Sequence, residues 1–161
     1  MDNDTLAPAF TYDVVCIDAD GNEKWREQFH NLVTTAGRTD LVDKYFRGSS
    51  YSASWFLGLK GAGTPNAADT MASHASWSEI TAYTSSTLPA ISFGAASAGS
   101  STASGVLFNI NGTATVAGAF ITTNSAKGAT TGVLYSAGDF AASRSVVNGD
   151  TLTVTPTVSV S

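Results

Sequence analysis

The C-terminal stretch of the chain shows the clearest hydrophobic pattern. From Leu152 to Val160 the even positions carry Leu, Val, Pro, Val and Val, and the odd positions carry only Thr or Ser. Alternation of this length predicts a β-strand with one buried face and one neutral face of hydroxyl groups. Pro156 has no backbone N–H to donate, so we expect this strand at a sheet edge or at a bulge.

Similar patterns predict short strands along most of the chain. The segment 25–32 has apolar residues at helical spacing but also fits a strand, so both interpretations remain open. A short helix is predicted over 39–48, because Thr39 or Asp40 can cap its start and Gly48 can supply a left-handed stop. The predicted strands are 11–17, 51–59, 132–135, 143–147 and 152–160, together with a hairpin over 105–123 that turns at Asn111-Gly112.

These elements predict an all-β fold: an antiparallel, jelly-roll-like β-sandwich of about eight strands with one short helix in the N-terminal third. We expect a single domain over 1–161 with an extended N-terminal segment. Residues 94–105 are rich in Gly, Ser and Ala, which is typical of a flexible loop or crossover and also of a domain boundary. Residues 77–83 are expected to form an extended arm.

Charge is distributed unevenly along the chain of 161 residues, whose net charge is −5. An acidic chain without a basic cluster is not expected to bind nucleic acid, and its apolar runs are too short to span a membrane. A surface made mostly of Ser, Thr, Asn and Gly suits packing against other proteins. Beyond Lys60 the ionised residues are Asp69, Glu79, Lys127, Asp139, Arg144 and Asp150.

Candidate chemistry is sparse. Residues 18–23 (DADGNE) carry calcium-ligand types without the EF-hand spacing, which favours a solvated turn. His30 and His74 lie far apart and lack zinc-site spacing to Cys16, which we expect to be buried. With no nucleophile elbow, we expect no enzyme: no catalytic residues, no cofactor and no metal. The alternative of a sugar-active enzyme would need opposed carboxylates, for which the candidates are Glu79, Asp139 and Asp150.

Two groups of residues are candidates for contact with a partner. Trp77 and Tyr83 lie in a weakly patterned segment, where interface contact competes with core filling. Trp55 shares a predicted strand face with Leu57 and Leu59, so core filling is favoured for it. The hydroxyl groups of the C-terminal strand form the second group. The predicted interface residues are Trp77, Tyr83, Thr153, Thr155 and Thr157.

Four segments, NLVTTAGRTDLVD (31–43), WSEITAY (77–83), GTATVAGAF (112–120) and GDTLTV (149–154), resemble small structural virion proteins of tailed bacteriophages. Within that group, the capsid cement or decoration class implies a β-sandwich without catalytic residues, attached to the exterior of an icosahedral shell. The partner implied is the major capsid protein, and the oligomer implied is a homodimer or homotrimer.

The sequence also leads to expectations about where the protein is made and about a second possible position in the virion. The start of the chain, MDNDTLAPAF, has no basic and apolar signal segment, so we expect synthesis in the host cytoplasm before attachment to the virion. The alternative is a tail, neck or fibre component with a host-binding role. That alternative predicts aromatic residues clustered on an exposed loop.

Overall fold

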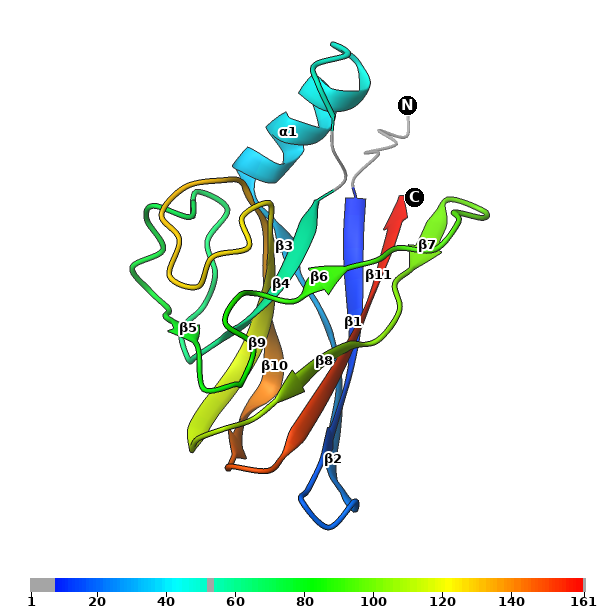
Figure 1. Ribbon diagram of the computed structural model, residues 1–161. Helices are drawn as coiled ribbons and strands as arrows, with labels where there is room; N and C mark the ends of the chain where they lie inside the picture. The colour runs from blue at the N-terminus through cyan, green and yellow to red at the C-terminus, as the bar shows by residue number, and fades with distance from the viewer. Residues whose placement is uncertain (1–7, 52–53, 161) are drawn as a thin grey trace.

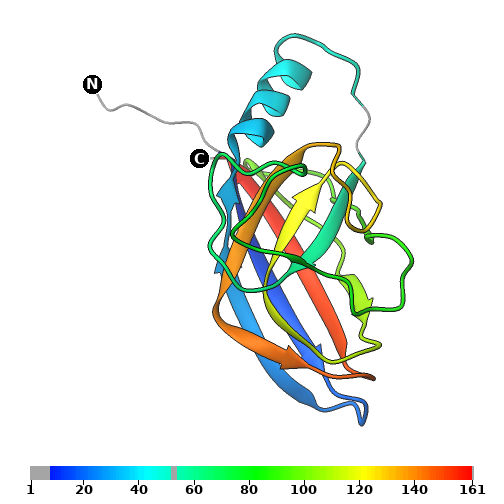
Figure 2. The ribbon, with the colours of Figure 1, turned by 90° about the vertical axis from the view of Figure 1, so that its left-hand side faces the viewer.

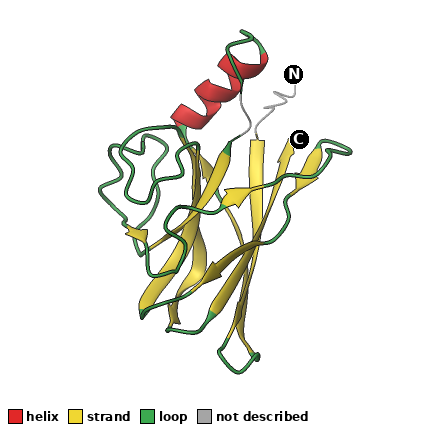
Figure 3. Ribbon diagram, viewed as in Figure 1, coloured by secondary structure: helices red, strands yellow, loops and turns green. Residues whose placement is uncertain are grey.

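The structure, a computed structural model, describes residues 8–51 and 54–160. These residues form two packed antiparallel sheets and one short helix, so the predicted all-β sandwich is confirmed (Figures 1 and 3). The elements are β1 (Pro8–Ile17), β2 (Glu23–His30), β3 (Leu32–Val33), α1 (Thr35–Tyr45), β4 (Trp55–Lys60), β5 (Glu79–Ile80), β6 (Ala90–Ile91), β7 (Ser100–Thr102), β8 (Val106–Asn109), β9 (Ala114–Thr122), β10 (Leu134–Val146) and β11 (Thr151–Val160).

The first sheet, sheet A, has the order β2-β1-β11-β7, and β8 also pairs with β11. The predicted alternation of β11 is confirmed, because Leu152, Val154 and Pro156 are buried and the threonines between them are partly exposed. The ambiguous segment 25–32 is mostly strand, since β2 pairs with β1 and directs Phe29 into the core. The first and last strands of the sandwich are therefore neighbours.

Of the two positions expected for Pro156, a sheet edge or a bulge, the structure rules out the sheet edge. β1 pairs along the whole of β11 on one side, and β7 and β8 pair with it on the other. The carbonyl of Pro156 accepts a hydrogen bond of 2.9 Å from the N–H of Ala103, which lies between β7 and β8. The N and C=O of one strand residue point to the same side, so the missing N–H of Pro156 faces this interruption. An inner strand thus accommodates a proline where its neighbour is broken.

The second sheet, sheet B, has the order β3-β10-β9-β4-β5, and β6 also pairs with β4. Residues 116–122 of β9 are all buried, although their side chains point alternately to opposite faces of the sheet. One face packs against sheet A. On the other face Phe120 packs against Trp77, with 5.3 Å between ring centroids, so the loop that carries Trp77 covers this side. A Cβ on Gly58 would lie 2.2 Å from the Phe120 ring, and a glycine there makes room for it.

The predicted hairpin over 105–123 is wrong. β8 pairs with β11 in sheet A, whereas β9 pairs with β4 and β10 in sheet B. The turn at Asn111-Gly112 therefore carries the chain from one sheet to the other (Figure 1). The predicted strands 132–135 and 143–147 overlap the two ends of one strand, β10, whose pairing with β9 shifts between Asp139 and Arg144.

The single helix begins at Thr35 rather than at Thr39. Thr34 caps it, because its Oγ1 accepts a hydrogen bond of 3.0 Å from the N–H of Gly37. Gly48 has the left-handed φ of +65° that the sequence predicted for it. In both views α1 stands at one end of the sandwich and continues beyond the ends of the sheets (Figures 1 and 2). Gly37 is its one buried residue.

Three further predictions can be compared with the structure, for residues 51–59, 1–7 and 94–105. The strand predicted over 51–59 is β4, in which Leu57 and Leu59 are fully buried, but Tyr51 precedes it and is exposed. Position 53 and the expected N-terminal extension at 1–7 lie outside the described residues. Within the stretch 94–105, residues 100–102 form β7 and pair with β11 in sheet A.

Candidate functional site

The outer face of β11 presents the hydroxyl groups that the sequence predicted. Thr153, Thr155 and Thr157 are partly exposed on the side of sheet A that points away from sheet B. The Oγ1 atoms of Thr157 and Thr102 lie 2.9 Å apart, which joins β11 to β7. We call this surface the threonine face and define it as Thr151, Thr153, Thr155 and Thr157 of β11, Thr11, Asp13, Val15 and Ile17 of β1, Thr102 of β7, and Leu107 and Asn109 of β8.

An apolar row crosses the threonine face. Leu107, Thr153 and Val15 lie opposite one another on three neighbouring strands. Leu107 is 50% exposed, and Val15 is half-buried. Threonine methyl groups and aliphatic side chains next to hydroxyl groups give the mixed polarity that is common at protein interfaces.

Ionised groups are almost absent from the threonine face. Asp13 is its single ionised side chain, and the Nε2 of Gln28 donates a hydrogen bond of 2.9 Å to that carboxylate. The neighbouring edge strand β2 carries the charges instead, including the pair Arg26 and Glu23 at 2.9 Å. Charge at an edge strand discourages unwanted strand pairing. The charges of sheet A therefore lie mainly on its edge strand and not on the threonine face.

The helix carries a second exposed surface. Leu41, Val42, Tyr45 and Phe46 recur at the spacing of one helix face, and they are 38%, 51%, 78% and 73% exposed. The rings of Tyr45 and Phe46 meet edge to face at 4.9 Å, and Tyr51, 59% exposed, follows the helix. We call these five residues the aromatic end. Sequence reasoning missed this surface, because apolar residues at this spacing normally indicate a buried helix face.

A cleft of about 240 Å³ separates the aromatic end from sheet B. Trp55 and Tyr135 form its floor, with their rings edge to face at 5.1 Å, while Asp40 and Lys44 stand among its walls. Burial, with smaller contributions from the nearby groups Asp40 and Tyr51, raises the pKa of the Tyr135 hydroxyl to about 12. The hydroxyl of Tyr135 therefore stays neutral at physiological pH.

Trp77 and Tyr83, two of the predicted interface residues, lie inside the protein. They are only 5% and 2% exposed, so the prediction that their side chains contact a partner is wrong and the core interpretation applies. The Nε1 of Trp77 donates a hydrogen bond of 2.9 Å to Asp69, and the Lys127 ammonium lies 3.7 Å from the centroid of the Tyr83 ring. Asp69 lies eight residues before Trp77, whereas Lys127 is far from Tyr83 in the chain, and the sequence pattern revealed neither contact.

Lys60 is a fully buried cation at the end of β4. Its Nζ contacts the carboxylate of Asp139 and donates hydrogen bonds of 3.0 and 2.8 Å to the carbonyls of Gly61 and Gly63. Lys60 and Asp139 both lie opposite Gly118 in the ladder, on the two strands that flank β9. A Cβ on Gly118 would come within 1.9 Å of a carbonyl oxygen of β10. The ion pair thus connects β4, β10 and the loop that follows β4.

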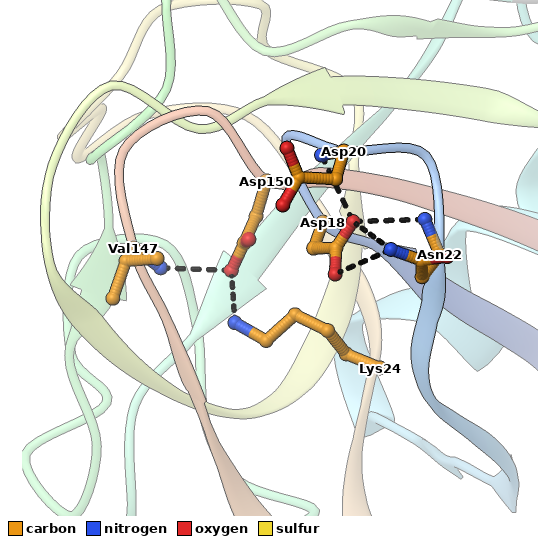
Figure 4. Close-up of polar contacts among 6 residues, drawn as sticks. All are labelled: Asp18, Asp20, Asn22, Lys24, Val147 and Asp150. Atoms are coloured by element: carbon orange, nitrogen blue, oxygen red, sulfur yellow. Dashed lines mark hydrogen bonds and ion pairs between the residues drawn. The ribbon is translucent and has the colours of Figure 1, made fainter.

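The acidic segment 18–23 is a hydrogen-bonded turn, as its pattern favoured (Figure 4). The Oδ1 of Asp18 accepts hydrogen bonds from the backbone N–H groups of Asp20 and Asn22 at 3.0 and 2.8 Å, and the second of these lowers the Asp18 pKa most. Asp150, nearby, is bound by Lys24 at 2.6 Å. Across the described ranges, no group of three or more His, Cys, Asp or Glu side chains is placed to hold a metal ion.

The other candidate catalytic residues are engaged in separate contacts. Glu79 accepts a hydrogen bond of 2.7 Å from a backbone N–H, and Asp139 and Asp150 each pair with their own lysine. The Nδ1 atoms of His30 and His74 lie 3.2 and 3.0 Å from threonine oxygens. These contacts give no support to the sugar-active enzyme that the acidic residues left open.

Comparison of the chain with protein-family models, with curated proteins and with solved structures finds no match. Within the described residues, the helix is neither long nor apolar enough to cross a membrane. The structure therefore establishes the fold class and two surface features. The chain is an antiparallel β-sandwich with a neutral threonine face along one sheet and an aromatic end beside its helix.

Proposed function

We propose that this chain is a structural virion protein of a tailed bacteriophage, and that it cements or decorates the exterior of an icosahedral capsid. In this role the threonine face binds across neighbouring subunits of the major capsid protein. The observation that carries the proposal is the neutrality of that face, on which Asp13 alone is ionised among the outward residues of β1, β8 and β11. The resemblance of four sequence segments to such proteins supplies the identity of the particle.

The physical reason for a neutral face is the cost of desolvation. An ionised side chain that loses water at an interface is expensive unless it finds a partner, whereas a threonine needs only one hydrogen bond and adds a methyl group to the apolar contact. A cement protein gains its effect from buried area and hydrogen bonds across joints between capsomers. Leu107 and Val15 supply apolar area on either side of Thr153, and the threonines of β11 supply the hydrogen bonds.

The experiment adds purified protein back to particles of the same phage made without it. Expected results are a copy number on the scale of the major capsid protein, read from a stained gel, and a higher temperature of DNA release. Leu107→Glu places a charge in the apolar row and should weaken binding at least tenfold, which corresponds to about 1.4 kcal/mol. The matched control is Val147→Glu, because Val147 is 44% exposed and lies outside both surfaces.

A second readout is side-chain footprinting of the threonine face on particles and on free protein. Amide exchange suits this question poorly, because the backbone of β11 is already paired on both sides within one chain. Modification of Leu107 should fall in the particle, and modification of Val147 should stay unchanged. Unaltered modification of Leu107, or wild-type binding by Leu107→Glu, contradicts the proposal.

The second candidate is a tail, neck or fibre component with a host-binding role. One observation favours it: Tyr45, Phe46 and Tyr51 cluster at the exposed aromatic end, beside the helix and the loop after it. This candidate predicts a few copies per virion, attached at one vertex. Copy number therefore separates the two candidates directly.

A further inference from the structure

The aromatic end is unusual because its apolar residues stay largely exposed, although Leu41, Tyr45 and Tyr51 line the cleft next to sheet B. A helix of a globular protein normally buries its apolar face, and an isolated helix of this length is marginal in water. In α1 the buried residue is Gly37, whereas Val42, Tyr45 and Phe46 are all more than half exposed. Among the described residues, no side chain covers these three enough to bury them. Such a face needs a partner to stabilise it.

We propose that the aromatic end is a self-association surface and that its occupant is a second copy of this chain. A buried aromatic side chain contributes about 200 Å². With the exposed fractions of Tyr45, Phe46 and Tyr51, and smaller contributions from Leu41 and Val42, the surface available is on the order of 500 Å² per copy. A pair of copies would bury roughly 1,000 Å², which is the threshold for a specific interface.

The shape of this end suits a two-fold dimer. In such a dimer the same patch meets itself, so it must hold both a projection and a recess. The exposed pair Tyr45 and Phe46 is the projection, and the cleft above Trp55 and Tyr135 lies directly beside it. Each copy can therefore place its aromatic pair against the cleft of the other.

The charge of the helix also permits a second copy to approach. The chain as a whole carries a net charge of −5, which opposes self-association. Residues 35–47 are an exception, because three basic side chains outnumber two acidic ones there. The segment therefore carries a local net charge of only +1, so charge on the helix itself adds little repulsion between two copies. These charged residues are Arg38, Asp40, Asp43, Lys44 and Arg47.

This inference concerns a different surface from the one that carries the proposed function. The aromatic end lies at one end of the sandwich, whereas β11 runs along its length (Figures 1 and 2). A dimer formed through the helices leaves the threonine faces of both copies open. It also assigns the aromatic cluster to self-association, which removes the observation that favours a host-binding tail component.

The test is the mass of the purified chain in solution, measured by analytical ultracentrifugation over roughly a hundredfold range of concentration around a micromolar Kd. The wild-type protein is expected to dimerise. Val42→Glu and Phe46→Ser should each weaken the dimer at least a hundredfold, while Val147→Glu should dimerise like the wild type. Val42 and Val147 have similar exposure, 51% and 44%, so the pair separates position from the general effect of a new charge. Circular dichroism of each variant confirms that the sandwich is folded.

Several outcomes overturn the inference. A wild-type chain that stays monomeric overturns it, including a monomer that dimerises only when residues 1–7 are deleted, since that segment would then be the occupant. A dimer that survives both Val42→Glu and Phe46→Ser overturns it as well. A monomer whose capsid binding is lost in Val42→Glu assigns the surface to the capsid instead. Leu107→Glu serves as the separate probe of the proposed function, so failure of one proposal does not imply failure of the other.

Discussion

The buried ion pair between Lys60 and Asp139 gives the sharpest prediction about stability. The two partners differ in exposure, because the Lys60 side chain is fully buried and the Asp139 side chain is 35% exposed. Removing one partner leaves the other unpaired, and the cost depends on whether the remaining group can reach water. Asp139→Ala should therefore destabilise the fold more than Lys60→Met.

The magnitudes follow from the contacts. Lys60→Met keeps most of the side-chain volume but leaves two carbonyls without their donor, at about 1 kcal/mol each, while Asp139 can still hydrate. We expect a loss of about 2–3 kcal/mol. Asp139→Ala leaves a buried ammonium without its counter-charge, which costs about 3–5 kcal/mol. The double variant should be more stable than Asp139→Ala alone, because it contains no unpaired charge.

Urea unfolding followed by tryptophan fluorescence measures these differences in the free energy of unfolding. The Trp77 ring centroid lies 5.7 Å from the Nζ of Lys60, so the fluorescence reports on this part of the fold. Asp43→Ala is the matched control: it removes an exposed ion pair with Arg47 and should cost less than about 1 kcal/mol. The reasoning fails if Lys60→Met costs as much as Asp139→Ala, or if the costs of the two single variants simply add in the double variant.

Three further predictions concern single residues. Gly37→Ala should lower the urea midpoint despite the better helix propensity of Ala, because the new Cβ would lie 2.4 Å from the Tyr135 carbonyl oxygen; a midpoint equal to or above wild type contradicts this. Cys16 is fully buried, as the sequence predicts, and burial raises its pKa to about 11, so iodoacetamide at pH 8 should alkylate the folded thiol at least about 100-fold more slowly than the denatured one. Burial raises the pKa of Glu79, so the folded state carries the cost of its charge above that pKa. Glu79→Gln should stabilise the protein by about 1 kcal/mol at pH 7, and this gain should shrink as the pH falls, because wild-type Glu79 becomes neutral; a gain that is constant with pH refutes the assignment.

The sequence by itself determined the strongly alternating strands and which of their faces are buried. The alternation of β11, the turn at 18–22 and the burial of Leu57 and Leu59 all follow from patterns within a few residues. The neutral threonine face could be predicted for the same reason, since the period of a strand places Thr153, Thr155 and Thr157 together.

Only the tertiary structure decided which strands are neighbours. An Asn-Gly turn between two apolar segments has the local signature of a hairpin, but here β8 and β9 belong to different sheets. Pro156 likewise suggested an edge, and the inner position became possible only through the break between β7 and β8. Local patterns specify a buried face without specifying what buries it, because the hydrophobic effect has no direction and many strands offer a similar apolar face.

The dependence on long-range packing also explains why the predicted interface residues differ from the exposed aromatic residues in the structure. Trp77 and Tyr83 were expected at an interface but are buried against Phe120 and Phe108, whereas Tyr45 and Phe46 lie at a helix that the sandwich leaves largely exposed. Whether an aromatic side chain is core or surface depends on where its element packs, and that is set by contacts between residues far apart in the chain.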